Sequence, residues 1–215
     1  MEARKNNGNG AERRSYNFEL RSTQTEDGKR QVRGHGAVYD SRSEDLGGFR
    51  EIIAKGAFDK AVNDDIRALF NHDPNQILGR TTAGTLKVST DERGLAYELV
   101  LPDTSYAKDL AVNLDLGNIT QSSFAMTVKR DRWEEEEDGT ILRTILEVEN
   151  LYDVSPVTYP AYQEADVRVA RRSLDAFKQQ LQDEVKTSPS ATRQRKLTIN
   201  INEAGLPATK FDTNG

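Results

Sequence analysis

The sequence of 215 residues contains no cysteine, which excludes disulfide bonds, a thiol nucleophile and thiolate metal ligands. It also lacks any run approaching the roughly 20 apolar residues of a membrane-spanning helix, and its first residues have no apolar signal segment. We therefore expect no membrane partner and a protein that stays where it is made. Aromatic residues make up only 7% of the chain, so we expect part of its length to remain outside a packed core.

An excess of positive charge is missing as well, because 30 basic residues face 35 acidic ones and the net charge is -5. A chain of this balance does not attract a polyanion, and we expect no nucleic-acid partner. Gly47-Gly48 is not followed by the lysine and hydroxyl residue of a phosphate loop, and the carboxylates of Glu134–Glu137 lack the alternating ligands of a calcium loop. We expect no cofactor and no metal.

Short segments of alternating apolar and polar residues, separated by turn residues, predict many strands. They are Tyr16–Leu20, Val32–Tyr39, Ile66–Phe70, Ile77–Arg80, Gly84–Thr90, Leu95–Leu101, Gln121–Arg130, Leu142–Val148 and Leu151–Thr158. Helical spacing predicts only a short helix at Ala57–Ala61 and a longer one at Ser105–Leu116. This pattern favours a β-rich α+β fold, with a closed or nearly closed β-barrel flanked by helices.

The two ends differ from this middle region. Residues 1–15 have no aliphatic side chain larger than alanine beyond Met1 and predict a disordered N-terminal arm, so that the folded domain spans residues 16–170. Residues 171–186 predict an amphipathic helix, because apolar residues recur at steps of three and four. Residues 187–215 read as a flexible tail with one extended piece at Leu197–Ile201.

The chain has two histidines, and imidazole is the usual base that activates a serine. His35 lies between two glycines in a strand segment, where packing or surface exposure is the simpler interpretation. His72 ends an apolar segment inside Asn71-His72-Asp73-Pro74, where a rigid scaffold can project it into a cleft. Local sequence alone favours a surface turn for His72.

Two adjacent serines, Ser122 and Ser123, lie inside an otherwise apolar segment where buried hydroxyls need hydrogen-bond partners. A serine hydrogen-bonded within a sheet is the simpler local interpretation. A nucleophile and base would need an acidic residue to orient the imidazole, and Glu147, Glu149 and Asp153 all fit by type.

Ten short stretches in order along the chain carry a resemblance to a known family. They are Val32–Tyr39, Ser43–Glu51, Gly56–Asp59, Leu69–Asp73, Ile77–Arg80, Gly84–Leu86, Asp91–Leu95, Leu101–Thr104, Ser122–Met126 and Asp153–Tyr162. Together they resemble the tailed-phage prohead proteases, which share a fold with the herpesvirus assemblins. The resemblance covers about residues 16–169.

The resemblance implies a serine endopeptidase in which His72 is the base and Ser123 is the nucleophile. In the family pattern a methionine precedes the serine and Gly-Phe follows Ser-Phe, whereas here Ser122 and Ala125-Met126 occupy these places. Asn150 stands where the acid of the family often falls, so we expect Glu149, rather than Glu147, to be brought in by a bulge or a shift of register.

The resemblance also implies backbone amides near Thr158 and Tyr159 as an oxyanion hole. The implied substrate is the scaffold region of the major capsid protein, cleaved inside the assembling prohead in the host cytoplasm, together with the ends of the protease itself. The helix over 171–186 could support self-association or act as a C-terminal scaffolding module fused to the protease. A noncatalytic capsid-assembly scaffold that kept the fold is the remaining alternative.

Overall fold

A computed structural model describes residues 4–5, 11–16, 20–26, 28–159 and 168–187. The rest of the predicted N-terminal arm, and the predicted tail from residue 188 with its extended piece at Leu197–Ile201, lie outside the described residues. The chain divides into two units, residues 1–173 and 174–215.

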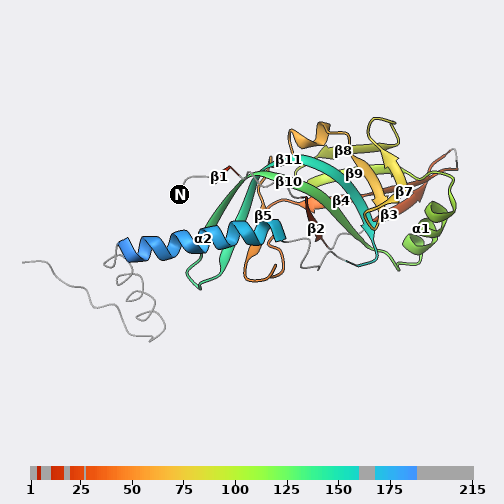
Figure 1. The fold of residues 1–215 in the computed structure, drawn as a ribbon. Helices are drawn as coiled ribbons and strands as arrows, with labels where there is room; N and C mark the ends of the chain where they lie inside the picture. The colour runs from red at the N-terminus through yellow and green to blue at the C-terminus, as the bar shows by residue number, and fades with distance from the viewer. Residues whose placement is uncertain (1–3, 6–10, 17–19, 27, 160–167, 188–215) are drawn as a thin grey trace, which may run out of the picture. The chain divides into compact units, whose positions relative to one another are not determined.

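The first unit is built on two β-sheets (Figure 1). The seven-stranded sheet runs in the order β1-β10-β11-β6-β7, with β2 also paired to β10 and β5 also paired to β11. Its strands are β1 (Arg4–Lys5), β2 (Glu12–Tyr16), β5 (Arg50–Ile53), β6 (Arg67–Phe70), β7 (Asp73–Arg80), β10 (Gln121–Glu135) and β11 (Ile141–Val157). The four-stranded sheet is β3 (Arg21–Gln24), β4 (Arg30–Val38), β9 (Gly94–Val100) and β8 (Leu86–Thr90), in that order.

The long hairpin of β10 and β11 is the centre of the larger sheet. Its tight turn closes with a hydrogen bond from the Gly139 amide to the Glu136 carbonyl, and Gly139 has a φ of 83° that glycine adopts without strain. β5 and β6 both run parallel to β11, and the other pairings of this sheet are antiparallel. The larger sheet is therefore mixed, whereas the smaller one is antiparallel.

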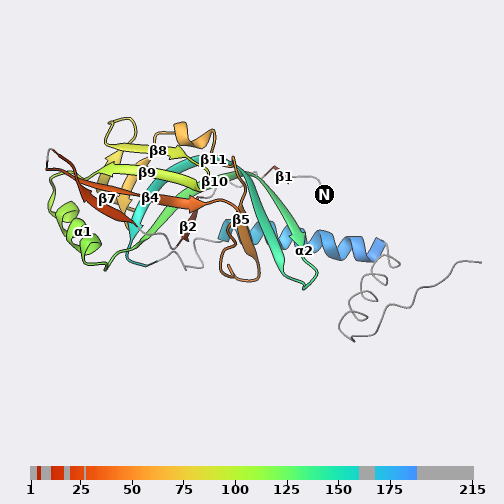
Figure 2. The ribbon, with the colours of Figure 1, turned by 180° about the vertical axis from the view of Figure 1, so that it is seen from behind.

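The hydrophobic core fills the space between the two sheets, where β4 and β9 lie over β10 and β11 (Figure 2). Phe124 of β10 is fully buried and meets Phe58 edge to face, with ring centroids 5.5 Å apart. Apolar residues on one face of each strand supply the rest, as the alternation in the sequence predicts.

The prediction of a closed or nearly closed barrel is wrong. In the described part of the chain the two sheets remain separate, and the strand at each end of a sheet pairs with one neighbour only. β7 ends the larger sheet, and Pro74 near its start has no N–H to donate to a further strand. Local alternation predicts strands, but closure of a barrel depends on which distant strand edges pair. Local alternation does not indicate that pairing.

Two of the three predicted helices are confirmed. The helix α1 (Ser105–Asp115) buries Leu110 and Leu114 and ends before Gly117, whose φ is 73°. The helix α2 (Arg168–Thr187) includes the predicted 171–186 segment, and its self-association stays a prediction. The third segment, at 57–61, forms turns that lead into a 3-10 helix, η1 (Ala61–Asn63).

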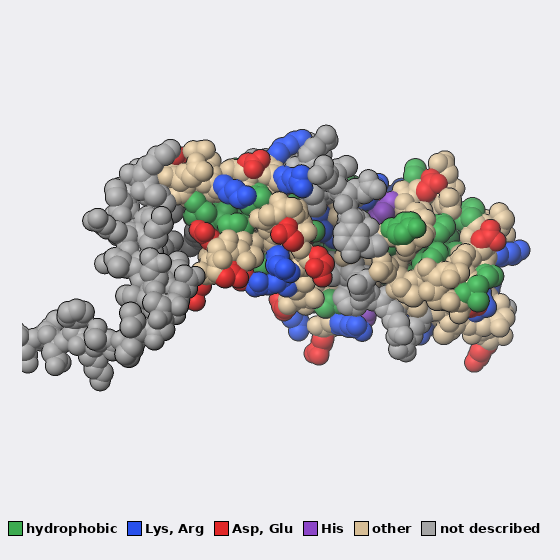
Figure 3. Space-filling model, turned by 90° about the horizontal axis from the view of Figure 1, so that it is seen from below, with side chains coloured by type: hydrophobic (Ala, Val, Ile, Leu, Met, Phe, Trp, Pro, Cys, Tyr) green, Lys and Arg blue, Asp and Glu red, His purple; other side chains and the backbone are tan. Residues whose placement is uncertain are grey.

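The outer surface carries charges of both signs. On the face shown in Figure 3, Lys and Arg side chains are interspersed with Asp and Glu side chains. In the described part of the chain, no helix is both long and apolar enough to cross a membrane.

Part of the predicted disordered arm is ordered, because Glu12–Tyr16 forms β2. This strand pairs antiparallel with Ser122–Met126 of β10. Two of its three charged residues, which composition alone would place in solvent, are buried: Glu12 is 0% exposed and Arg14 is 3% exposed. Their partners come from distant strands and are described below.

Candidate active site

The hairpin turn between β6 and β7 presents His72. Asn71 and His72 are its two central residues, and both have positive φ, 54° and 57°, as in the type I′ turns that suit tight hairpins. Asn71 attaches this turn to the end of β11: its amide donates to the Pro156 carbonyl, its Oδ1 accepts from the Thr158 amide at 2.8 Å, and its Nδ2 donates to Thr158 Oγ1. The imidazole is thereby held over β11.

Ser122 and Ser123 point to opposite faces of β10, since successive strand residues alternate. Ser122 Oγ lies 3.0 Å from the hydroxyl of Tyr97 on β9, on the core side, and burial raises the pKa of Tyr97. Ser123 Oγ lies 2.7 Å from His72 Nε2 on the other side. The fold therefore separates the two serines into a packing residue and a residue in contact with imidazole.

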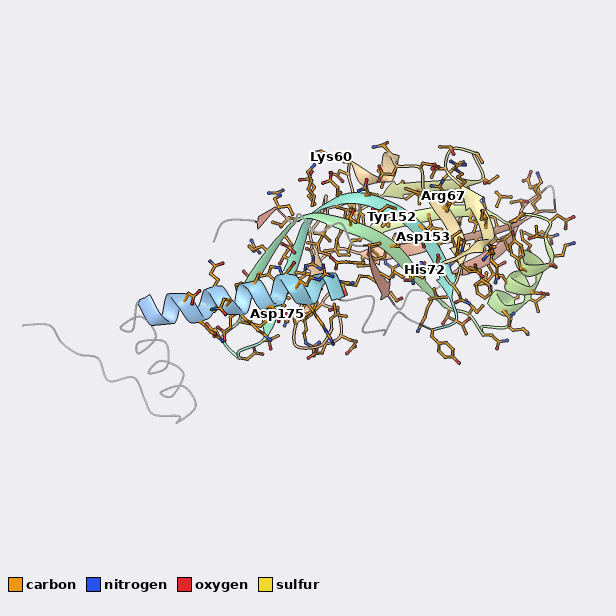
Figure 4. The ribbon with its side chains drawn as sticks, viewed as in Figure 1. Lys60, Arg67, His72, Tyr152, Asp153 and Asp175 are labelled. Carbon is orange, nitrogen blue, oxygen red and sulfur yellow. The ribbon has the colours of Figure 1, made fainter. Side chains whose placement is uncertain are left out.

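A β-bulge in β11 aims Asp153 at the same imidazole. Leu151 pairs with Met126 and Asp153 pairs with Ala125, so Tyr152 is an extra residue on β11. In a strand without a bulge, Asp153 would lie on the same face as Leu151, which is the core face. With the bulge, Asp153 Oδ1 lies 2.6 Å from His72 Nδ1, and Figure 4 shows these labelled side chains where β11 passes the β6–β7 hairpin.

Ser155 fixes the carboxylate from the other side. Its hydroxyl donates to Asp153 Oδ1 at 2.7 Å, and Ser155 is directly opposite Ser123 in the ladder. The result is a continuous series of hydrogen bonds from Ser155 through Asp153 and His72 to Ser123. The exposed fractions of the His72 and Asp153 side chains are 7% and 9%, so little water competes with these contacts.

The structure brings together His72 and Ser123 but does not bring Glu149 to them. The Glu149 carboxylate is 48% exposed and lies 3.5 Å from Lys129 Nζ. Glu147 bonds to Lys60 at 3.0 Å, and this contact lowers the pKa of Glu147. A bulge does occur at Glu149, between the pairs Val128↔Val148 and Thr127↔Asn150, but it leaves that carboxylate in solvent.

The remaining expected residues have other contacts. His35 Nε2 lies 2.9 Å from Asp91 Oδ2, so this imidazole pairs with a different carboxylate and not with Asp153. The Thr158 amide, expected in an oxyanion hole, donates to Asn71. The expectation for an oxyanion donor therefore rests on Tyr159.

The resemblance places the acid near Asn150 and therefore favours Glu149 over Asp153, and the alternation of a regular strand puts both residues on one face and does not separate them. One signal could have found it: Asp153 lies within the last family-like stretch, and Ser155 two residues later supplies a hydroxyl to the same face.

A serine hydroxyl, an imidazole and a carboxylate joined in this order form the arrangement that serine hydrolases use. A family model described as caudovirus prohead serine protease matches residues 16–180. The chain belongs to this family, which confirms the resemblance seen in the sequence.

Among solved structures, the chain is similar to the capsid assembly protease of bacteriophage T4, with 13% identity and a TM-score of 0.44. The match covers 71% of this chain and 100% of that chain. No curated protein matches the chain.

Proposed function

We propose that the protein is a capsid maturation endopeptidase with Ser123 as nucleophile, His72 as general base and Asp153 as the residue that orients the base. The observation that carries this proposal is the hydrogen-bond series through the three side chains, 2.7 Å and 2.6 Å in its two steps. Asp153 takes the role expected of Glu149 because only the former contacts the imidazole.

In this mechanism Ser123 Oγ attacks the carbonyl carbon of the substrate peptide while His72 Nε2 accepts the hydroxyl proton. Collapse of the tetrahedral intermediate breaks the C–N bond, and His72 returns the proton to the leaving amine. A water molecule then hydrolyses the acyl-enzyme by the same proton transfers. Asp153 accepts a hydrogen bond from His72 Nδ1 throughout, which fixes the tautomer and stabilises the imidazolium.

The substrate we propose is the scaffold region of the major capsid protein, cleaved inside the assembling prohead in the host cell. Family membership supports a role in capsid maturation. Enclosure with many copies of a substrate raises its effective concentration, so weak intrinsic affinity suffices. The ends of the protease are a second proposed substrate.

The alternative of a noncatalytic scaffold has less support. His72 has left-handed backbone geometry, and its imidazole lies between a buried serine and a buried carboxylate. Both features cost stability, and a noncatalytic scaffold would gain nothing from them. A protease with a C-terminal scaffolding module remains compatible with this proposal, because α2 follows the site residues in the chain.

Co-expression with the capsid protein tests the proposal by intact mass. Ser123→Ala and His72→Ala should abolish trimming, whereas the matched changes Ser122→Ala and His35→Ala should retain it. Loss of a triad member costs roughly three orders of magnitude or more in rate, so the contrast is large. Trimming by a folded Ser123→Ala variant at the wild-type rate would exclude Ser123 as nucleophile.

A further inference from the structure

The nucleophile is covered by the chain's own N-terminal strand. β2 pairs with β10 over Ser122–Met126, and Ser123 is 0% exposed. The Ser123 hydroxyl lies 2.9 Å from the carbonyl oxygen of Arg14 and is placed to donate to it. An extended peptide added to a sheet edge is a common mode of peptide recognition, and β2 has this form.

The contact between Ser123 and Arg14 is inhibitory rather than productive. A serine hydroxyl has one proton, and here the Arg14 carbonyl and His72 Nε2 both lie within hydrogen-bond distance of it. The carbonyl oxygen faces the hydroxyl, whereas attack requires the carbonyl carbon to face it. β2 therefore occupies the edge without presenting a bond for cleavage in this geometry.

The Arg14 side chain lies between the buried carboxylates of Glu12 and Glu51. Its Nε donates to Glu51 Oε1 at 2.7 Å and its Nη2 donates to Glu51 Oε2 at 3.0 Å, so the guanidinium binds Glu51 with two parallel hydrogen bonds. Nη2 also donates to Glu12 at 2.6 Å. The planar fork of arginine fits this geometry, and the ammonium of lysine does not.

We call Glu12, Arg14, Glu51, Asp131 and Arg143 the buried charge cluster. Arg143 donates to Glu12 at 2.7 Å, to Glu51 at 2.9 Å and to Asp131 at 2.8 Å. Four of the five residues are at most 2% exposed, and Arg14 is 3% exposed.

The charges and contacts of the cluster indicate which group fits beside Glu51. Glu12 and Arg14 belong to β2, and the other three belong to β5, β10 and β11. Without β2, two carboxylates, Glu51 and Asp131, face one guanidinium, Arg143. β2 adds one charge of each sign, Glu12 and Arg14, so the excess of one carboxylate is the same with and without it. A buried carboxylate is costly without a cationic partner, and Glu51 accepts two parallel hydrogen bonds from Arg14, so Glu51 favours a guanidinium at this place.

We propose that the β10 edge beside Ser123, with Glu51, is a substrate subsite for an arginine side chain, and that β2 of the same chain fills it as a pseudosubstrate. The subsite rests on the function proposed above. A peptide bound there would pair with β10 as β2 does and place its arginine opposite Phe124, one residue along β10 from the nucleophile.

The first test measures access to Ser123 in the full chain with a fluorophosphonate probe that labels activated serines. Arg14→Ala should be labelled faster than wild type by roughly tenfold or more, since truncating one partner of a buried charge pair weakens a contact by at least that factor. Arg13→Ala is the matched control, because this neighbouring arginine on β2 is exposed. It should be labelled at the wild-type rate. If Arg14→Ala does not fold, Arg14→Lys, which keeps the charge but loses the fork, should show a smaller increase.

The second test adds an acetylated, amidated peptide of residues 11–16 to the Arg14→Ala variant. It should suppress labelling, and the same peptide with neutral citrulline in place of Arg14 should suppress it much less. Adding Glu51→Gln to that variant should abolish the difference between the two peptides. A β2 with only a structural role would give no such discrimination.

Equal labelling of wild type, Arg14→Ala and Arg14→Lys, or equal inhibition by the two peptides, would overturn the subsite while trimming of the capsid protein still supports the triad. Failure of the function itself looks different: no folded variant would be labelled at Ser123, and Ser123→Ala would trim like wild type.

Discussion

At the scale of single residues, two hydrogen bonds distinguish Asp153 from the other carboxylates of β11. Asp153 contacts both His72 and Ser155, whereas Glu147 and Glu149 contact lysines on the surface. A carboxylate that contacts the imidazole stabilises it as a cation in the transition state, which a carboxylate in solvent cannot do.

We therefore predict that Asp153→Asn lowers kcat by roughly 10⁴-fold with a small effect on KM, because an amide holds the shape but not the correct tautomer. Glu149→Gln is the matched control and should change kcat by little. Single-turnover cleavage of the capsid substrate measures both. An inactive Glu149→Gln beside an active Asp153→Asn would return the role to Glu149.

Some residues of the site could be predicted from the sequence and others could not, for physical reasons. Ser123 and His72 followed from the family resemblance, although local sequence favoured simpler roles for both. Asp153 was not preferred because a single inserted residue, Tyr152, reverses the facing of everything after it, and bulges leave no clear local mark. Arg14 was assigned to a disordered arm because residues 1–15 lack large aliphatic side chains, and its buried partner Glu51 lies 37 residues along the chain.

At the scale of elements, the β6–β7 hairpin is the part that sets the position of the base. Its two central residues adopt left-handed backbone geometry. Among the described residues, Asn71 is the one whose side chain links this hairpin to Thr158. Turn conformation and attachment are separate properties, and they can be removed separately.

Asn71→Gly should keep the turn and the backbone bond to Pro156 but lose the side-chain bonds to Thr158, lowering kcat by roughly 10- to 100-fold through misplacement of His72. Asn71→Ala should lower kcat similarly and also lose about 1 kcal/mol of stability relative to Asn71→Gly, because a Cβ disfavours positive φ. Thermal unfolding and kcat together separate the two effects. Full kcat in Asn71→Gly would show that the attachment does not position the base.

At the scale of the whole molecule, the buried charge cluster links β2 to β5, β10 and β11, which lie far along the chain. Burial opposes ionisation of Glu12, yet the guanidiniums of Arg143 and Arg14 hold the pKa of Glu12 below its ordinary value of 4.5. A carboxyl group with a lowered folded-state pKa stabilises the fold above its unfolded pKa, and this stabilisation is lost as the pH falls.

Glu12→Gln should consequently lower the free energy of unfolding by about 3 kcal/mol at neutral pH, as expected when one partner of a buried pair is removed. The difference from wild type should shrink as the pH falls below 4.5, the range in which wild-type Glu12 itself takes up a proton. Denaturant unfolding at several pH values measures this, with Glu147→Gln as a surface control. A difference that does not change with pH would indicate that the charge of Glu12 is not what stabilises β2.

Active protease should also shorten its own ends, within residues 1–15 or 187–215. A cut on the C-terminal side of Arg14 would remove the strand that covers Ser123 and would be followed by faster trimming. Intact-mass measurements over time, with Ser123→Ala as the control that stays whole, follow both events. Intact ends in a preparation that trims the capsid protein would contradict self-processing.

The pairing of β2 with β10 also sets an order of events during synthesis. Arg14 and Ser123 are 109 residues apart, so roughly 5 to 20 seconds separate their emergence at ordinary rates of translation. Asp153 emerges later still. β2 has therefore been synthesised when β10 emerges, and it can cover Ser123 before Asp153 has been made. If the proposed triad is correct, a nascent chain that folds in this order would have Ser123 covered by β2 before its triad is complete.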